Sequence, residues 1–219
     1  MNKPLIVIVG MGPGIGSAVA TRFGREGFGV GMVARSAGKL AAHARALQDT
    51  GIDASHALAD AGDPDALARA LATIEEARGP ASVLLYNAAH IKWKNILEES
   101  APSLLDDFKV NVAGAMTAVH AVLPGMRREN RGTILLTGSM FATRPVAQFG
   151  SLSIGKAGIR SLAFMLAGAL KDTGIHVATV TVAGQVRPGD PKRSPEAIAD
   201  ACLRLHLQQP GEFATEVEC

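Results

Sequence analysis

Four glycines at two-residue spacing, Gly10, Gly12, Gly14 and Gly16, are the first feature of the chain that could do chemistry. They follow the apolar run 4–9 and precede an amphipathic segment that begins at Ile15, which predicts a strand, a tight turn and a helix in that order. Glycine lets the backbone approach a ligand closely, and a helix N-terminus offers free N–H groups and the positive end of its dipole. We therefore predict that a pyrophosphate binds above this turn.

Further polar residues stand where other strands are expected to end. They are Arg35 after the strand expected over 28–34, Asp60 after 52–58, Asn87 after 83–86 and Ser139 after 133–137. In open α/β sheets the ligand lies beyond the carboxyl ends of the parallel strands. These side chains and the glycine turn are therefore expected to meet at one rim of the sheet.

The elements that must position these residues alternate between strand and helix along the chain. Helices are expected over 15–23, around Leu40, after the N-cap Asp63, over 103–128 and 153–171, and from Ser194 to 207, with further strands over 175–182 and 213–217. Helices this long between strands indicate right-handed crossovers and a parallel sheet. We predict one Rossmann-like α/β domain over residues 1–219, doubly wound, with about seven strands in the order 3-2-1-4-5-6-7 and helices on both faces.

Composition narrows the function classes. The formal net charge of +2 on 219 residues leaves no basic footprint for nucleic acid, and the cluster Arg127, Arg128 and Arg131 fits a solvated helix end. Two cysteines, Cys202 and Cys219, form no metal or redox motif, and no metal site is expected. With no signal peptide and no apolar run of membrane-spanning length, we expect a cytoplasmic protein without a membrane partner.

In their order along the chain, these motifs resemble the short-chain dehydrogenase/reductase family over nearly the whole length. The glycine turn matches the family's cofactor turn with Val9 in place of a threonine, and Asn87-Ala88-Ala89 resembles Asn-Ala-Gly with its glycine replaced. Ala183-Gly184-x-Val186 resembles Pro-Gly-x-Val without its proline. The cofactor-binding residues that this resemblance implies are Gly10, Gly12, Pro13, Gly14, Ile15, Gly16, Arg35, Asp60, Asn87, Ala88, Ala89, Lys156, Gly184 and Val186.

The resemblance also implies that Asn111, Ser139 and Lys156 are catalytic, but one family residue is replaced. The family has a tyrosine four residues before its lysine, and this chain has Leu152 there. That tyrosine protonates the carbonyl oxygen as hydride arrives, and its loss typically removes ~10²–10⁴-fold in rate. The longer spacing of enoyl reductases is not met either, because Phe149 stands at that position.

Arg35 bears on the choice of cofactor. NAD-dependent relatives carry an aspartate there for the ribose 2′-OH, whereas a guanidinium suits a 2′-phosphate through paired charge-assisted bonds. We therefore expect NADP rather than NAD. The alternative is a surface arginine that only covers the adenine, and Pro13 stands where NADP-preferring members often place a second basic residue.

Several groups are candidates for the missing proton donor. The hydroxyls of Ser139 and Ser153 are too basic to act unaided. Tyr86 is the only tyrosine and is expected to point to the opposite face, into the core. His90 follows Asn87-Ala88-Ala89 on the rim, and imidazole is a usual proton donor, but a loop histidine is more often only solvated. Lys156 could donate, directly or through water, if Leu152 desolvates it, and its alternative role is to hold the ribose hydroxyls.

The substrate side is less informative. Only residues 185–193 are available for a lid, which implies an open pocket, and Ile91 and Trp93 either line it or form a loop that contacts a partner. The long helices 103–128 and 153–171 favour a homodimer or homotetramer on family grounds.

Two functions stay open at this point. The first is an NADP(H)-dependent oxidoreductase that acts on a small carbonyl or alcohol with a non-standard proton donor. The second is a catalytically silent NADP(H)-binding sensor or partner subunit. A P-loop enzyme is excluded because no Gly-Lys-Ser/Thr follows the glycine turn.

Overall fold

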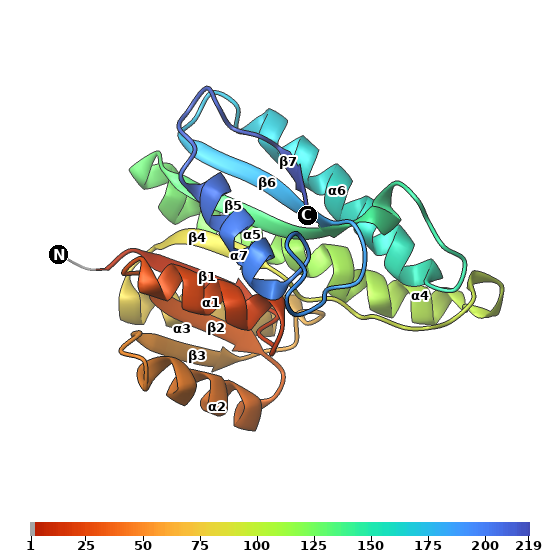
Figure 1. Ribbon diagram of the computed structural model, residues 1–219, viewed down its shortest axis with the longest axis horizontal. Helices are drawn as coiled ribbons and strands as arrows, with labels where there is room; N and C mark the ends of the chain where they lie inside the picture. Colours follow the sequence, from red (N-terminus) through yellow and green to blue (C-terminus); the bar gives the residue numbers. More distant parts are fainter. Residues whose placement is uncertain (1–2) are drawn as a thin grey trace.

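The computed structural model describes residues 3–219, whose strands form one parallel seven-stranded sheet (Figure 1). The order is β3-β2-β1-β4-β5-β6-β7, which confirms the predicted fold class and strand order. The strands are β1 (Leu5–Val9), β2 (Gly29–Ala34), β3 (Ala54–Leu58), β4 (Ala81–Tyr86), β5 (Gly132–Ser139), β6 (Ile175–Val182) and β7 (Glu216–Glu218).

Helices cover both faces of the sheet. One face carries α1 (Ile15–Arg25), α2 (Ala37–Gln48) and α7 (Pro195–His206), and the other carries α3 (Pro64–Arg78), α5 (Gly114–Glu129) and α6 (Gly150–Ala169). The short helix α4 (Ala101–Phe108) packs against α6 and lies at one end of the molecule (Figure 1). Single helical turns are η1 (Ile96–Glu98), η2 (Lys109–Ala113) and η3 (Met140–Ala142).

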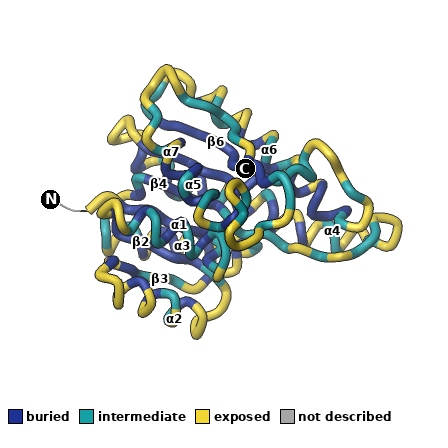
Figure 2. The backbone as a smooth tube through the Cα atoms, viewed as in Figure 1, coloured by how far each residue is buried: buried dark blue, intermediate teal, exposed yellow. Residues whose placement is uncertain are grey.

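The sheet is the core of the molecule, and β1 shows why. All five of its side chains are buried, with Leu5, Val7 and Val9 in one hydrophobic cluster and Ile6 and Ile8 in the other. Successive side chains of a strand point to opposite faces, so an unbroken apolar run suits a strand that is covered on both sides. Figure 2 shows the central strands of the sheet buried and the loops around α4 largely exposed.

Two predicted helix starts are confirmed in detail. The Asp63 side chain accepts a hydrogen bond from Ala66 N at 3.0 Å, with Pro64 at the first helical position of α3. Ser194 does the same for Ala197 N at 3.1 Å, ahead of Pro195 in α7. Each cap satisfies one of the N–H groups that a helix leaves unpaired at its start.

The single helix predicted over 103–128 is wrong in its middle. The π-helical turn η2 separates α4 from α5, and Asn111 lies in that turn. A π turn inserts one extra residue without changing the apolar periodicity enough to be visible in the sequence. Helix α6 begins three residues earlier than predicted, and β7 is shorter and later than the predicted strand 213–217 because Phe213 stacks on His176 at 4.3 Å instead.

No helix within residues 3–219 is both long and apolar enough to cross a lipid bilayer.

Candidate functional site

The glycine turn between β1 and α1 forms an open cradle. Gly10 has φ +90°, and a Cβ there would overlap the backbone of Ala88, so only glycine fits. At Gly12 and Gly14, in contrast, nothing lies within 4 Å of a hypothetical Cβ. The turn therefore leaves space directly above the N-terminus of α1, where backbone N–H groups lack intrahelical partners. A phosphate group fits both the space and the donors.

Asn87 ties this turn to its neighbours. Its Nδ2 donates to Gly10 O at 3.0 Å, and its Oδ1 accepts a hydrogen bond from Thr137 Oγ1, also at 3.0 Å. One amide thus joins the ends of β1, β4 and β5. Asn87 and the two residues after it line a cavity of about 210 Å³ together with Gly10, Arg35, Asp60 and His90. The rim predicted from the strand ends is therefore formed on its β1, β2 and β4 side.

Arg35 lies at the mouth of this cavity. Its side chain is 63% exposed, and Nη1 lies 3.9 Å from Asp60 Oδ2 and 3.3 Å from His90 Nε2. The other Asp60 oxygen accepts from Gly62 N at 2.9 Å and so holds the loop after β3. An exposed ion pair at this distance contributes little to stability, which leaves the guanidinium available to an anion.

His90 is not the solvated loop histidine that a position after β4 suggests. Its Nδ1 lies 3.1 Å from Oδ1 of Asp107, a carboxylate with no exposed surface, and Lys92 Nζ lies 2.7 Å from the same oxygen. Burial raises the pKa of Asp107, but hydrogen bonds from Lys92, Ser151 and His90 outweigh it and hold that pKa below its usual value. The carboxylate therefore stays ionised at neutral pH.

Asp107 and its partner Lys92 were missed by the sequence analysis. The signal for Asp107 was its spacing, because it stands four residues before Asn111, and residues four apart on a helix lie on one face. Asn111 Oδ1 accepts from His90 N at 2.7 Å, and a Cβ on Gly155 of α6 would press against Asn111 at 2.7 Å. Asn111 thus joins the loop after β4 to the helix that carries Lys156.

On the side of the rim formed by β5 and α6, which we call the reaction side because it holds Ser139, Lys156 and Leu152, the polar groups bind other protein groups. Lys156 Nζ donates to Thr137 O at 2.5 Å, and Ser139 Oγ accepts from Phe141 N at 3.3 Å, where it caps η3. Burial lowers the pKa of Lys156 from its usual 10.5 to about 8. Leu152 is buried with 5% exposure, so an apolar side chain lies one helical turn before the lysine.

Tyr86 does not replace the missing tyrosine. It is 2% exposed, its hydroxyl donates to Val110 O, and burial raises its pKa far above the neutral range. This confirms the predicted core position. Ser153 also has a structural role, since its Oγ accepts from Val146 N at 3.2 Å and holds the loop before α6.

Aromatic side chains gather beside the reaction side. Trp93 packs edge-on against Phe149 with ring centroids 4.8 Å apart, and Phe149 stacks on Phe141 at 5.2 Å. Trp93 is nevertheless 77% exposed and Ile91 is 71% exposed.

The segment 185–193, expected as a lid, folds on itself, because Asp190 pairs with Arg193 at 2.7 Å. That pair, together with backbone N–H donors, lowers the pKa of Asp190 to about 2. Val186 of this segment packs against the core, and Gly184 faces Arg193.

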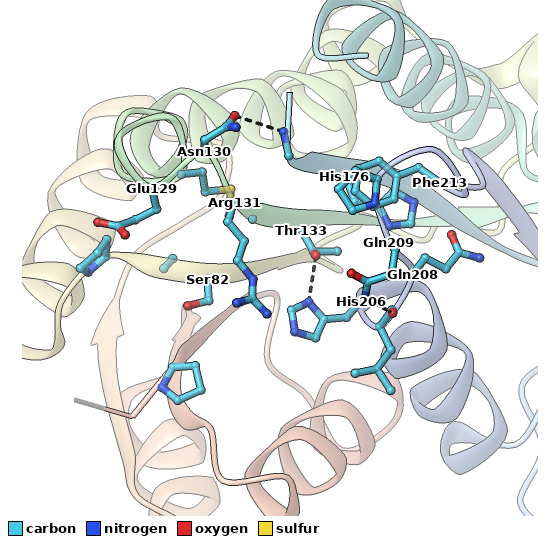
Figure 3. A pocket seen from close by; sticks show the side chains of 18 of the residues that line it. Ser82, Glu129, Asn130, Arg131, Thr133, His176, His206, Gln208, Gln209 and Phe213 are labelled. Atoms are coloured by element: carbon cyan, nitrogen blue, oxygen red, sulfur yellow. Dashed lines mark hydrogen bonds between the residues drawn. The ribbon is translucent and has the colours of Figure 1, made fainter. Parts of the chain in front are cut away.

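The largest cavity described, of about 900 Å³, lies at the amino-terminal ends of the central strands, where Pro4, Ala81 and Gly132 line it. Figure 3 shows it from close by. Arg131, Thr133 and His206 face each other there, and Thr133 Oγ1 is 2.9 Å from His206 Nδ1. Burial, with Arg131 and His176 nearby, lowers the pKa of His206 to about 4. This cavity has no glycine cradle and none of the predicted site residues, so it is not the dinucleotide site.

Within residues 3–219, no group of three or more His, Cys, Asp or Glu side chains could hold a metal ion. The candidate site consists of three parts: the glycine cradle, the cavity lined by Arg35, and the side of the rim that holds Lys156.

The chain is similar to proteins of a known family. The family model described as short chain dehydrogenase matches residues 4–188. The 3-dehydrosphinganine reductase TSC10B of Arabidopsis thaliana is 32% identical over 198 residues, covering 87% of this chain and 59% of the relative. The chain thus spans about three fifths of the length of that relative.

Solved structures agree with the family model. A metagenomic short-chain oxidoreductase in complex with NADP superposes with a TM-score of 0.90 at 27% identity, covering 100% of this chain and 97% of that chain. The actinorhodin polyketide ketoreductase with NADPH has a TM-score of 0.89 at 23% identity, covering 99% and 94%, and shares the fold. The chain belongs to the short-chain dehydrogenase family.

Proposed function

We propose that this protein binds NADP(H) along the Gly10–Arg35 rim and is an oxidoreductase that acts on a small carbonyl or alcohol. The observation that carries the proposal is the open cradle at Gly12 and Gly14, with the Arg35 guanidinium at the mouth of the adjoining cavity. The metagenomic relative in complex with NADP supports the choice of cofactor. The cofactor-binding residues are those that the sequence resemblance implies, from Gly10 to Val186.

Each part of the rim has a role in this proposal. The backbone of Gly12–Gly16 holds the pyrophosphate, Asp60 and Ala88 contact the adenosine end, and Arg35 takes the 2′-phosphate. Bound NADPH supplies the hydride. A guanidinium offers a planar fork of donors that matches a phosphate, whereas an aspartate at this position would repel it.

Lys156 is the group we propose to hold the transferred proton. It is the one proton-bearing side chain of the described β5–α6 rim whose pKa is displaced to near neutrality, at about 8, and burial is the cause. A group with such a pKa is partly deprotonated at physiological pH and can exchange a proton in either direction. In this proposal Ser139 orients the substrate oxygen, and Asn111 fixes the backbone around His90.

A second candidate, a catalytically silent NADP(H)-binding protein, is favoured by two specific contacts. Lys156 Nζ already donates to Thr137 O at 2.5 Å, and Ser139 Oγ already accepts from Phe141 N to cap η3, so each group has a structural role in the fold. In such a protein the adenosine side binds and the reaction side only completes the fold.

Binding and turnover separate these functions. The wild-type protein is titrated with NADPH and NADH by nicotinamide fluorescence and then incubated with small aldehydes, ketones and alcohols. Tight NADPH binding with turnover supports the oxidoreductase, and tight binding without turnover supports the silent protein. The variant Gly12→Val is the control, since its side chain meets no protein atom within 4 Å of Cβ but fills the cradle. Binding of NADPH to Gly12→Val at wild-type affinity would refute the proposed site.

We also propose a homo-oligomer. Leu105, Phe108 and Met116 on α4–α5 and Phe164 and Met165 on α6 keep between 36% and 62% of their surface exposed. Side chains of this kind on neighbouring helices suit a contact between copies. Sedimentation of the wild type and of Phe108→Glu tests it, with a smaller species expected for the variant. A cytoplasmic location stays a prediction from the sequence.

A further inference from the structure

We propose that His90 is a positioning residue for Arg35, which holds the guanidinium where it recognises the 2′-phosphate of NADP(H). The inference rests on the proposed function, because it assigns a supporting partner to the arginine that selects NADP. It makes His90 a determinant of cofactor preference. The buried Asp107 then fixes the orientation of the His90 ring.

The contact between the two side chains fixes the direction of the hydrogen bond. Arg35 Nη1 lies 3.3 Å from His90 Nε2. A guanidinium can only donate, so Nε2 must accept through its lone pair. The ring proton of a neutral imidazole is then on Nδ1.

Asp107 imposes the same tautomer from the other side of the ring. Its Oδ1 lies 3.1 Å from His90 Nδ1, and an ionised carboxylate can only accept. Lys92 and Ser151 help to keep that carboxylate ionised, and it has no exposed surface through which water could replace the histidine. Two independent partners therefore specify one ring orientation, with Nδ1–H toward Asp107 and the Nε2 lone pair toward Arg35.

The backbone of His90 is anchored separately. Its N–H donates to Asn111 Oδ1 at 2.7 Å, and its carbonyl accepts from Asn111 Nδ2 at 3.5 Å. Replacement of the ring consequently leaves the main chain in place. The side chain can be tested without disturbing Asn111.

This arrangement leaves most of the guanidinium for an anion. Arg35 has five N–H donors, of which one meets His90, and Asp60 lies at the longer distance of 3.9 Å. Holding a flexible arginine in one orientation reduces the entropy lost when the phosphate binds. Only the phosphorylated cofactor gains from this, because NADH has no 2′-phosphate.

The test measures dissociation constants for NADPH and NADH by fluorescence titration. For His90→Ala we expect NADPH to bind about five-fold more weakly, as for the loss of one hydrogen bond, with NADH within two-fold of wild type. His90→Gln should restore most of the affinity, since its amide oxygen can reach the position of Nε2. His56→Ala, on the exposed face of β3, is the matched control and should change neither constant.

The ring tautomer gives a second readout that is independent of any cofactor. Imidazole ¹⁵N shifts of His90 should report a proton on Nδ1 and none on Nε2. An Nε2–H tautomer or an imidazolium would overturn the inference, and so would equal loss of NADPH and NADH affinity in His90→Ala, or no loss of either.

The variant Arg35→Ala separates this failure from failure of the proposed function. If Arg35→Ala binds NADPH as wild type does, the NADP assignment is wrong. If Arg35→Ala weakens NADPH and His90→Ala does not, the assignment stands and only the role of His90 is refuted.

Discussion

Two sides of the rim differ in the groups that form them: the adenosine side, which holds the glycine turn and Arg35, and the reaction side, which holds Ser139, Lys156 and Leu152. The adenosine side consists of a glycine turn whose backbone faces open space and of Arg35, an exposed side chain. On the reaction side, Lys156 and Ser139 are engaged by the protein, and Leu152 fills the place of the family's acid. The proposed pyrophosphate site therefore depends on backbone shape, whereas the proposed catalysis depends on individual side chains.

This difference explains why the two sides can diverge. Pyrophosphate binding at the glycine turn would be shared among several backbone N–H groups, so no single side chain would decide it. Proton transfer needs one group at one position with a suitable pKa, and a single substitution removes it. Restoring one residue on the reaction side, or replacing one on the adenosine side, should therefore change one function without the other.

The largest effect is expected when the tyrosine is restored. Leu152→Tyr should raise turnover of a carbonyl substrate by ~10²–10⁴-fold, the usual contribution of a positioned general acid. Steady-state kinetics with NADPH measure it. Leu152→Phe is the matched control, because it adds the ring without the hydroxyl and should stay at the wild-type rate. Equal rates for the two variants would show that the reaction side lacks more than the acid.

Reversal of charge on the adenosine side should have the next largest effect. Arg35→Asp would replace the proposed charge-assisted bonds to the 2′-phosphate by repulsion, and NADPH affinity should fall by about 100-fold, roughly 3 kcal/mol. NADH affinity should be kept or improved, since an aspartate can accept from the ribose 2′-OH. Calorimetry with both cofactors checks this, and a parallel loss of both would point to a damaged fold.

Lys156 should make the stability of the protein depend on pH. Its folded pKa of about 8 lies below the usual 10.5, so below pH 8 the folded state bears the cost of a buried charge. Between pH 8 and 10.5 the folded state has released the proton while the unfolded chain keeps it, so stability rises with pH. Relative to Lys156→Met, the wild type should gain about 3 kcal/mol across this window in urea unfolding. The exposed Lys171→Met should show no such trend.

The smallest effect is expected at Tyr86. Tyr86→Phe removes one buried hydrogen bond, to Val110 O, and should lower the free energy of unfolding by about 1 kcal/mol. Turnover should not change. A loss of turnover larger than tenfold, with stability retained, would identify Tyr86 as a proton donor and contradict its core assignment.

The sequence predicted the fold because its signals were local and repeated. Apolar runs such as that of β1, the caps Asp63 and Ser194 and the alternation of strand and helix all depend on neighbours within a few residues. The ends of the strands then determined the rim, and Arg35, Asp60 and Asn87 do line one cavity.

Contacts between residues far apart in the chain could not be predicted from the sequence. Asp107 becomes informative only once His90, 17 residues earlier, folds against it. The hydrogen bond from Lys156 to Thr137 O depends on how α6 packs on β5, and the π turn around Asn111 leaves the apolar pattern nearly unchanged. These features come from tertiary packing, which periodicity does not encode.

Thr137 has a consequence for how the two ends of the rim communicate. Its hydroxyl holds the Asn87 amide, and its carbonyl accepts from Lys156, so a single residue touches both. We expect a shift of Asn87 to alter the surroundings of the lysine through Thr137, and the charge of the lysine to act on Asn87 by the same route. Thermodynamic linkage is reciprocal. Proton affinity at Lys156 and dinucleotide affinity at the glycine turn are therefore expected to change each other by the same factor.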